Sequence, residues 1–585
     1  MKDFFKIMFA TMAGFCITAF LFSAIFIVFI FIFIAALSPD ETVQYSSNSI
    51  LKVELNYEIP EKSGYSGFAG FEKGFSQQLG IYDITKAINN AANDKKIKAI
   101  YLDLNYIGAE GMAAAQVIRR AIEKFKASGK PVYAHGNYIS QLEYFIASSA
   151  DKIFLTPTGG IEIKGLSAQS FYFKGTFEKL EIEPQIFRKG SFKSSVEMFT
   201  QKKMSDADKI QVNAILSSLD SVFVQEICKS RNIPSEKLNE MIKNFEIRSP
   251  QKALENGLID SLCFEKGMFK YIDKKLNVKT DVNTISIHEY AKVPEVNGKS
   301  ASDLIAVIYA TGDITTSSGD DYEIGTENII EHLRDASKDK NVKGIVLRIN
   351  SPGGDPLTSD LILNEIKETK KLKPVIVSMG EVAASGGYYI ACAADAIVAE
   401  HSTLTGSIGV FGMIPNIKNL LENKLGITTD RLNTGEFSDY RSVLRPVSEK
   451  ERMFIQEEID RIYTTFVNHV AEGRKLSFEK VDEIAQGRVW SGSDAKKIGL
   501  VDELGGIDKA LEITAKKAKI KSYNTVEYPK AKDPFDIITD FVSGGVEISY
   551  LKYRLGDDYK YFGILEEIKR YNGVQARIPF NLKIN

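Results

Sequence analysis

The sequence predicts two α/β domains in tandem, each with a parallel sheet, preceded by one transmembrane helix. Three observations support this fold class. The same series of motifs occurs twice in the same order, each copy alternates Ile- and Val-rich runs with helical patterns, and a long apolar run stands near the start of the 585-residue chain. Strands that alternate with helices are typical of right-handed βαβ units, which build parallel sheets. A chain of this length exceeds one ordinary domain, which fits a duplication.

The predicted membrane anchor covers residues 7–37. No charged residue occurs between Lys6 and Pro39, and this run contains AFLFSAIFIVFIFIFIAAL. About 20 apolar residues span a bilayer as a helix, and the apolar core of a cleaved signal peptide is shorter. We therefore expect an uncleaved anchor, with cleavage after the small residues of AALS as the open alternative. Because basic flanks stay in the cytoplasm, Lys2 and Lys6 predict that residues 1–6 are cytoplasmic and that the rest of the chain lies beyond the membrane.

Three collinear matches identify the duplication. The segment KKIKAIYLDLNYIG resembles DKNVKGIVLRINSPG, GKPVYAHGNYISQLEYFIASSADKIFL resembles LKPVIVSMGEVAASGGYYIACAADAIVA, and KALENGLIDSL resembles DAKKIGLVDEL. Self-similarity at a constant spacing is the signature of repeated structural units. We predict a first domain over residues 47–300, a second over 301–530, and an extension over 531–585 whose role the sequence does not indicate. The end of the extension, RIPFNLKIN, alternates like a strand.

Each copy is predicted to contain the same order of strands and helices. A buried strand is followed by a helix, a second strand that begins after Lys-Pro, a turn with a small-residue helix, and a third strand. Continuous Ile and Val runs favour strands that are buried on both faces. The predicted elements are strands Ile97–Leu104, Val132–Ala134 and Ile153–Leu155 with helix Met112–Phe125 in the first copy, and strands Val342–Ile349, Val375–Ser378 and Ala396–Ala399 with helix Leu357–Thr369 in the second.

The segment GEVAASGG of the second copy places Ser385 among small residues, after a predicted strand. The segment NSPGG follows the preceding strand, and ligands of parallel α/β sheets bind at these carboxyl ends. The first copy has Gln141 opposite Ser385 and lacks the Pro-Gly-Gly turn. Because a packing role would not explain the loss of both features together, we interpret Ser385 as a nucleophile. An extended substrate is expected to pair beside the Pro-Gly-Gly turn as an added strand.

Lys193 of the first copy is the predicted partner of Ser385. The first copy reads GSFKSS where the second reads GEFSDY, so Lys193 corresponds to Ser438. A serine hydroxyl becomes nucleophilic when a base takes its proton, and a lysine acts as that base only as a neutral amine. Apolar neighbours such as Phe192 and Val196 would lower the lysine pKa by burial. The sequence leaves open whether the pair forms within one chain or between subunits, and the duplication favours one chain.

Two backbone amides complete the predicted site. If Ser385 begins a helix, the N–H groups that follow it have no helical partner and can stabilise an oxyanion. The amide of Gly386 and that of Gly354, in the Pro-Gly-Gly turn, are predicted to converge there. Glycine at both positions allows the backbone to approach the substrate closely.

Composition argues against several other classes of function. The formal net charge is -2, so the chain has no overall basic field that would attract nucleic acid. Its 4 cysteines lack a CxxC spacing, and its 5 histidines lack an HxxxH pair. These spacings are the usual sequence signs of a zinc site. We therefore expect no bound metal, no other cofactor and no nucleic-acid partner.

Four segments, LRINSPGG, VSMGEVAASGGYYIACAADAIVA, HSTLTGSIGVFG and GSFKSSVEMF, together resemble the signal peptide peptidase A family, also called protease IV, in its long duplicated form. The resemblance implies a ClpP/crotonase fold and a Ser-Lys serine endopeptidase that hydrolyses cleaved signal peptides and similar hydrophobic peptides through an acyl-enzyme. It implies that Ser385 is the nucleophile and Lys193 the general base. It also implies that Gly354 and Gly386 are oxyanion donors, and that Ser407, in LTGSIG, positions the lysine.

The same resemblance implies an assembly and a location. It implies a homotetramer that one helix anchors in a bacterial-type inner membrane, with the catalytic ectodomain on the periplasmic or extracytoplasmic side. Two alternative functions stay open. A crotonase-type acyl-CoA enzyme would use the same fold with a glutamate acid/base pair and a CoA pocket, and a membrane-tethered scaffold would need no catalytic groups. The pair of Ser385 and Lys193 favours the peptidase.

Overall fold

The computed structural model describes residues 2–37, 43–65, 77–279, 283–296, 301–320, 322–530 and 573–578. The chain divides into two compact units, of which one contains helix α1 (Lys2–Leu37) and the other contains the sheets of both repeats together with residues 573–578. The domain boundaries drawn from the sequence stay predictions. Of the extension over 531–585, residues 573–578 are described, and most of the strand predicted from RIPFNLKIN lies outside the described residues.

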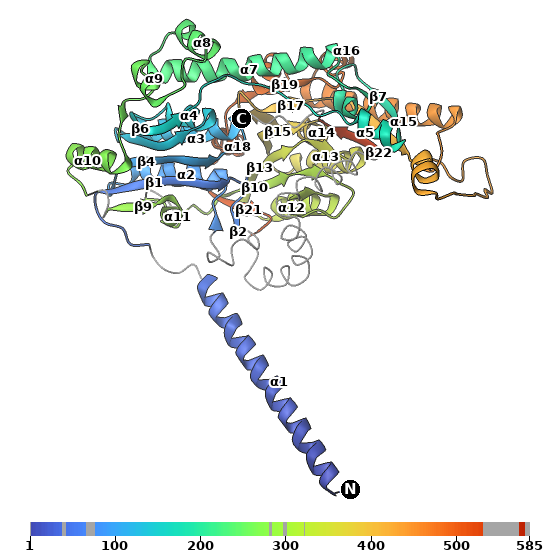
Figure 1. Ribbon diagram of the computed structural model, residues 1–585, viewed down its shortest axis with the longest axis horizontal. Coiled ribbons are helices and arrows are strands. Elements are labelled where there is room, and N and C mark those ends of the chain that lie inside the picture. Colours follow the sequence, from blue (N-terminus) through green and yellow to red (C-terminus); the bar gives the residue numbers. More distant parts are fainter. Residues whose placement is uncertain are drawn as a thin grey trace. The chain divides into compact units, whose positions relative to one another are not determined.

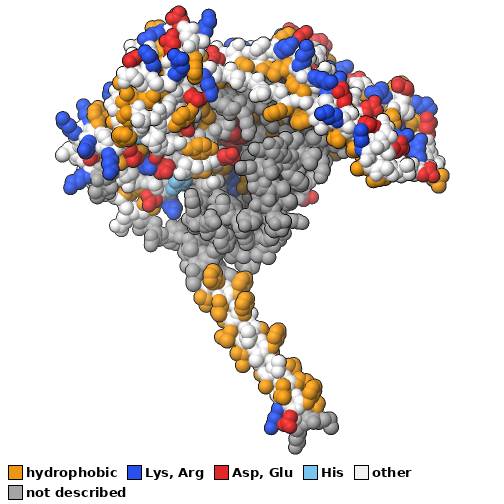
Figure 2. Space-filling view, in the orientation of Figure 1, with side chains coloured by type: hydrophobic (Ala, Val, Ile, Leu, Met, Phe, Trp, Pro, Cys, Tyr) orange, Lys and Arg blue, Asp and Glu red, His pale blue; other side chains and the backbone are white. Residues whose placement is uncertain are grey.

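Helix α1 is long and apolar enough to cross a membrane, judged by its length and composition. Its candidate span is Asp3–Phe26, with a mean hydropathy of 2.0, and it is the one such helix found among the described residues. Figure 2 shows apolar side chains along the described part of the helix, with charged side chains near its N-terminal end. The helix begins earlier than the predicted anchor over 7–37, because MKDFFK contains no Pro or Gly that would interrupt it. Such a helix fits a membrane-anchored protein.

The first repeat is built on a six-stranded parallel sheet with the order β8-β6-β5-β4-β1-β9. Its strands are β1 (Ser49–Glu58), β4 (Ile97–Gly108), β5 (Val132–Ile139), β6 (Lys152–Ile161), β8 (Ser261–Leu262) and β9 (Thr284–Ser286). Helices α2 (Ile81–Asn93), α3 (Met112–Ala127), α4 (Gln141–Ala147) and α10 (Glu265–Leu276) connect or cover them. Met268 and Ile272 of α10 pack on one face of this sheet, which buries the Ile- and Tyr-rich strand side chains.

The second repeat has an eight-stranded sheet with the main order β19-β17-β15-β13-β10-β21. Strand β16 also pairs with β15, and β20 pairs with β16. Its strands are β10 (Leu304–Thr311), β13 (Val342–Ser351), β15 (Val375–Ala384), β16 (Ala396–Ala399), β17 (Leu404–Gly406), β19 (Val489–Ser491), β20 (Glu503–Leu504) and β21 (Asn524–Tyr528). Its helices include α12 (Thr326–Lys338), α13 (Pro356–Lys370), α14 (Gly386–Ala391) and α18 (Ile507–Ala518). Figure 1 shows the two sheets side by side, with α7 (Asp206–Arg231) running along both repeats.

The duplicated α/β fold class is confirmed, with the predicted strands and helices in the predicted order in both repeats. The main difference concerns β15, which was predicted to end at Ser378 and continues to Ala384. Its first half pairs with β16, and its second half, from Val382, pairs with β17. This change of partner extends the strand, because β17 supplies backbone hydrogen bonds beyond the end of β16. The nucleophile candidate therefore follows a strand directly.

A smaller sheet joins the two repeats, with the order β12-β11-β14-β22-β18-β7. Its strands are β7 (Glu183–Lys189), β11 (Asp313–Ile314), β12 (Glu323–Ile324), β14 (Gly353–Gly354), β18 (Val410–Asn416) and β22 (Gly573–Arg577). Strand β7 leaves the first repeat and runs antiparallel to β18 of the second, from the pair Lys189 and Val410 to the pair Glu183 and Asn416. This crossing carries the chain that follows β7 toward the end of β15.

Buried polar contacts hold the two repeats in register. The carboxylate of Glu61 and the guanidinium of Arg348 form a bidentate ion pair at 2.8 and 3.1 Å, and their side chains are 8% and 3% exposed. Glu381 of β15 accepts hydrogen bonds from the amides of Ala113 and Ala114 at 2.9 and 3.2 Å, where α3 of the first repeat begins. Burial raises the pKa of Glu381 to about 8. These contacts fix the strand that leads to the predicted nucleophile against the first repeat.

Candidate active site

Ser385 occupies a sharp turn between β15 and α14. Its backbone has φ 54° and ψ -114°, a conformation that costs energy for any residue other than glycine. The turn is held because the Ser385 amide donates to the Gly406 carbonyl at 2.8 Å and the Tyr389 amide donates to the Ser385 carbonyl at 2.8 Å. A strained turn from a strand into a helix presents the serine Oγ at the end of the sheet, as at other nucleophilic serines. The predicted position of Ser385 at the start of a helix is confirmed.

Lys193 reaches Ser385 from the first repeat of the same chain. It lies in the turn after β7, and its Nζ is 2.7 Å from Ser385 Oγ. The amine also donates to the carbonyl oxygen of Ser407 at 3.1 Å, and its distance to Ser407 Oγ is 3.0 Å. Three oxygens from the second repeat therefore surround the amine. The pair that the sequence left open between one chain and two forms within a single chain.

The lysine is buried without a counter-charge. Lys193 is 0% exposed, and none of the ion pairs found in the described part of the chain involves it. Burial lowers the pKa of Lys193 well below its ordinary value, since desolvation penalises the ammonium form. A lowered pKa increases the neutral fraction of the amine at any given pH, and the neutral amine is the state that can accept a proton from a hydroxyl.

Two glycines that the sequence reasoning did not single out shape the space for the lysine stem. A Cβ on Gly487 would lie 2.6 Å from the Cβ of Lys193, and a Cβ on Gly409 would lie 3.2 Å from its Cδ. Gly487 also has φ 75°, which favours glycine. Gly409 belongs to GSIGVFG, the same motif that contains the predicted Ser407, so the sequence offered a local signal for it. Gly487 is far from both motifs in sequence, and no local signal identified it.

Ser407 itself is fixed by the backbone around it. It has φ 50°, and its amide donates to the carbonyl of Arg488 at 2.7 Å. This conformation turns both the hydroxyl and the carbonyl of Ser407 toward Lys193. Both serines beside the amine thus have positive φ, a backbone conformation that is uncommon for residues other than glycine.

The amides of Gly354 and Gly386 lie close together beside the serine. A Cβ on Gly386 would lie 3.1 Å from the nitrogen of Gly354. Gly354 has φ 155°, and a Cβ there would lie 2.0 Å from the carbonyl oxygen of Ile314, so this position accepts only glycine. The structure therefore brings together all the predicted site residues, Ser385, Lys193, Ser407, Gly354 and Gly386. It adds strand β22, which the sequence reasoning did not place at the site.

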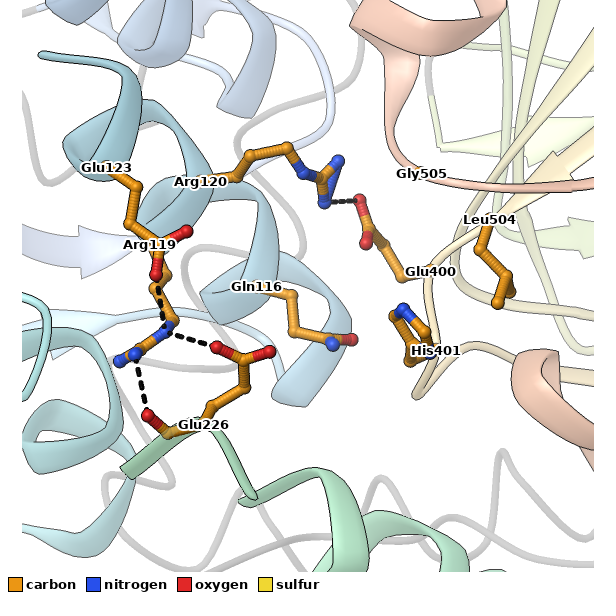
Figure 3. Close-up of a pocket in the computed structure, with 9 residues that line it drawn as sticks. All are labelled: Gln116, Arg119, Arg120, Glu123, Glu226, Glu400, His401, Leu504 and Gly505. Atoms are coloured by element: carbon orange, nitrogen blue, oxygen red, sulfur yellow. Dashed lines mark hydrogen bonds and ion pairs between the residues drawn. The ribbon is translucent and has the colours of Figure 1, made fainter. Parts of the chain in front are cut away.

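A separate cavity of about 140 Å³ lies between the repeats and contains none of these residues. Figure 3 shows that charged side chains line it in pairs. Arg119 contacts Glu123 and Glu226 at 3.3 and 3.4 Å, and Arg120 contacts Glu400. Its glutamates are therefore engaged in ion pairs. Within the described ranges, no group of three or more His, Cys, Asp or Glu side chains is arranged to hold a metal ion.

Comparison with known proteins identifies the family. The profile of Peptidase family S49 matches the chain twice, at residues 124–279 and 367–521, and the Clp protease profile matches residues 296–403. Protease 4 of Haemophilus influenzae is 36% identical over 447 residues, which cover 74% of this chain and 72% of that protein. Protease 4 of Salmonella typhi is 36% identical over 483 residues, 80% of this chain and 77% of its own. The structure of ClpP1 from Listeria monocytogenes is 20% identical, covers 34% of this chain and 91% of its own, and has a TM-score of 0.23.

These matches agree with the architecture. The S49 profile falls once on each repeat, which confirms the duplication, and the Clp protease profile falls on the strands that lead to Ser385, which confirms the ClpP-like fold. The two relatives each match over more than 70% of their own length. The chain therefore belongs to peptidase family S49, as a duplicated member of the Protease 4 group of serine proteases.

Proposed function

We propose that the chain is a membrane-anchored serine endopeptidase whose nucleophile is Ser385 and whose general base is Lys193. The observation that carries this proposal is the distance of 2.7 Å between Lys193 Nζ and Ser385 Oγ, in a site where burial lowers the pKa of the lysine. A neutral amine at hydrogen-bond distance satisfies the geometric and the electrostatic requirement for a base. Ser407 is the positioning residue, since it holds the amine through two contacts.

The reaction follows from this arrangement. Lys193 takes the Ser385 proton as Oγ attacks the substrate carbonyl carbon, and the amides of Gly354 and Gly386 stabilise the oxyanion that forms. The lysine then gives the proton to the leaving amine as the C–N bond breaks, which leaves an acyl-enzyme on Ser385. Water next attacks the ester while Lys193 accepts its proton. The ester bond breaks, the proton returns from Lys193 to Ser385 Oγ, and the product leaves as a carboxylic acid that loses its proton to solvent.

The proposed substrates are hydrophobic peptides, including signal peptides that remain after secretory proteins are processed. Apolar side chains from both repeats, which include Leu404 and Leu219, cluster against Ala384, next to the nucleophile. An apolar surface there favours apolar substrate side chains. We further propose that α1 anchors the protein with its N-terminus in the cytoplasm and the repeats in the periplasm or its equivalent, and that the protein assembles as a homotetramer.

The two alternative functions have less support. A crotonase-type enzyme needs free glutamates in an acyl-CoA pocket, and the glutamates of the described cavity between the repeats are paired with Arg119 and Arg120. A scaffold would not need the strained backbone of Ser385 or an uncompensated buried lysine, and both features cost stability. A peptidase would use both the strained serine and the buried lysine, which explains why the fold keeps two features that lower its stability.

The proposed function is tested with the full-length chain in detergent. A fluorogenic hydrophobic peptide with a small residue at the cleaved bond should be hydrolysed, and a fluorophosphonate should label Ser385, as located by peptide mass mapping. Both signals should be absent from Ser385→Ala. The matched control is Ser402→Ala, which changes another buried serine of the second repeat, one that bonds to Gln116 and not to Lys193. Peptide turnover that survives in Ser385→Ala would refute the assignment.

The pH dependence of activity follows from the direction of the lysine pKa shift. Since the protonated amine cannot act as a base, kcat/KM should rise about tenfold per pH unit at acidic pH. It should level off well below the ordinary lysine pKa of about 10.4, because burial lowers the pKa of Lys193. Steady-state rates of peptide hydrolysis from pH 5 to 10 measure this profile. A flat profile between about pH 5 and 9 would exclude Lys193 as the base.

A further inference from the structure

Strand β22 lies where the sequence reasoning expected a substrate. It runs antiparallel to β14 and β18, with Ala576 opposite Gly354. The amide of Ile578 donates to the carbonyl of Pro352 at 2.9 Å, so the pairing continues along the Pro-Gly-Gly turn. A peptide that bound by strand addition would use these same backbone groups. Residues 573–578 thus occupy the strand edge that a substrate would need.

The carbonyl of Ala576 lies beside the amides that are predicted to bind an oxyanion. The position that a Cβ on Gly353 would take is 2.1 Å from the Ala576 oxygen and 2.7 Å from the Gly386 nitrogen. The carbonyl and the predicted donor therefore share one small space. Ala576 is 0% exposed, so its side chain also fills a closed position at the site. A substrate carbonyl cannot enter this space while Ala576 occupies it.

Side-chain contacts hold the segment on both of its faces. The guanidinium of Arg577 forms a bidentate ion pair with Asp313 of β11 at 3.0 and 2.9 Å, and Ser195 Oγ donates to the Arg577 carbonyl at 3.1 Å. Bidentate arginine–carboxylate pairs are specific in geometry as well as strong. Ile578 is 3% exposed and lies in an apolar cluster drawn from both repeats. The other buried members of that cluster are Ile215, Leu219, Ala384, Leu404 and Val489.

We propose that residues 573–578 are an intramolecular competitive inhibitor, a substrate mimic that fills the substrate path at Ser385 and is held there by Asp313. This inference rests on the proposed peptidase function. With the segment in place, Ser385 and Lys193 are both 0% exposed, so a second peptide cannot reach them. Because the segment is part of the chain, its effective concentration at the site is on the order of millimolar, and a free peptide has to compete with it. A substrate with a basic residue at the position of Arg577 would use the same carboxylate.

The first test releases the segment by a change outside the catalytic residues. Arg577→Glu places a carboxylate against Asp313, and the like charges should expel the segment. The matched control, Gln575→Ala, changes the same strand but keeps the ion pair. The measurements are kcat/KM for a short fluorogenic hydrophobic peptide and the second-order rate constant for fluorophosphonate labelling of Ser385. Both should rise at least about tenfold in Arg577→Glu and change less than about twofold in Gln575→Ala.

The second test adds the segment back as a free peptide. The capped peptide GVQARI, which corresponds to residues 573–578, should inhibit the Arg577→Glu enzyme competitively. The capped peptide GVQAEI should inhibit at least about tenfold more weakly, because it cannot pair with Asp313.

The inference is wrong if the wild type and Arg577→Glu have equal hydrolysis and labelling rates, or if GVQARI does not inhibit. Failure of the proposed function would look different. In that case neither the wild type nor any variant, Arg577→Glu included, would hydrolyse the peptide or take up label at Ser385. Failure of the inference alone would leave an active enzyme that is indifferent to the state of residues 573–578.

Discussion

Replacing Lys193 with methionine is expected to lower kcat/KM for peptide hydrolysis by at least about 10³-fold. Methionine has a similar volume and can fill the same buried position, but it cannot accept a proton from Ser385. Among the described residues, Lys193 is the one titratable group hydrogen-bonded to the Ser385 hydroxyl. The residual rate would come from the oxyanion donors and from substrate binding, as in serine proteases that have lost a member of the catalytic group. Combining this change with Ser385→Ala should add little, because the two residues act as one unit.

The same replacement should stabilise the fold at neutral pH. Burial lowers the pKa of Lys193 in the folded state, so the unfolded chain binds a proton that the folded chain binds weakly. Stability from this group therefore falls as pH drops below the unfolded value near 10.4, by about 1.4 kcal/mol for each unit by which the pKa is lowered. Methionine removes this cost. We expect a higher Tm for Lys193→Met at pH 7, and a smaller difference from the wild type as the pH approaches 10.

The control for Lys193→Met is Lys202→Met. Lys202 lies in the same region of the first repeat, and its side chain is 67% exposed and forms a surface ion pair with Glu178 at 3.1 Å. Such pairs contribute about 0–1 kcal/mol, so the control should change neither activity nor Tm appreciably. Peptide hydrolysis assays and thermal unfolding of the full-length chain in detergent measure both quantities. Full activity in Lys193→Met would rule out a Ser-Lys mechanism in this protein.

Replacing Glu61 with glutamine is expected to lower the free energy of unfolding by about 3–5 kcal/mol, because it leaves the buried guanidinium of Arg348 without its opposite charge. The two side chains join the repeats and are 8% and 3% exposed, so solvent cannot replace the lost interaction. Arg348 also donates to the Ser378 hydroxyl at 2.9 Å and to the Met379 carbonyl at 2.6 Å in β15. We therefore expect a loss of activity as well, since these contacts hold the strand that leads to Ser385.

An exposed ion pair between the same two repeats provides the matched control. Lys124 and Asp508 are 2.6 Å apart, and their side chains are 48% and 33% exposed. Asp508→Asn should cost at most about 1 kcal/mol. Urea unfolding followed by the fluorescence of Trp490, the 1 tryptophan of the chain, compares the two variants. If Glu61→Gln costs no more than Asp508→Asn, burial does not decide the strength of this contact.

The local pattern of the chain was enough to predict the repeated strands and helices. Uninterrupted apolar runs such as those of β4 and β13 can be satisfied only in a sheet that is covered on both faces, so their secondary structure follows from composition. Strand ends were less predictable. The residues between Ser378 and Ser385 look like a turn, and they are strand because β17, a distant segment, supplies the hydrogen bonds. No local rule contains that information.

In the candidate site, too, some features could be predicted from local sequence and others depended on the folded structure. Comparing the two copies indicated Ser385 and Lys193, because each copy keeps one of the two residues, and turn chemistry indicated Gly354 and Gly386. Gly487 could not be predicted in this way. Its role is to leave room for the stem of Lys193, which is distant in sequence, and a steric requirement of that kind appears only when the chain is folded.

Residue identity and order were therefore sufficient for the duplicated α/β architecture, the apolar anchor helix and the chemical groups of the site, since propensity, periodicity and turn chemistry act over short stretches of chain. The folded structure alone decided that β7 crosses to the second repeat, that Lys193 Nζ stands 2.7 Å from Ser385 Oγ without a counter-charge, and that residues 573–578 lie across the site. The physical reason is that pKa values and access to solvent depend on the sum of all neighbours in space. Those neighbours come from segments that are hundreds of residues apart in the chain.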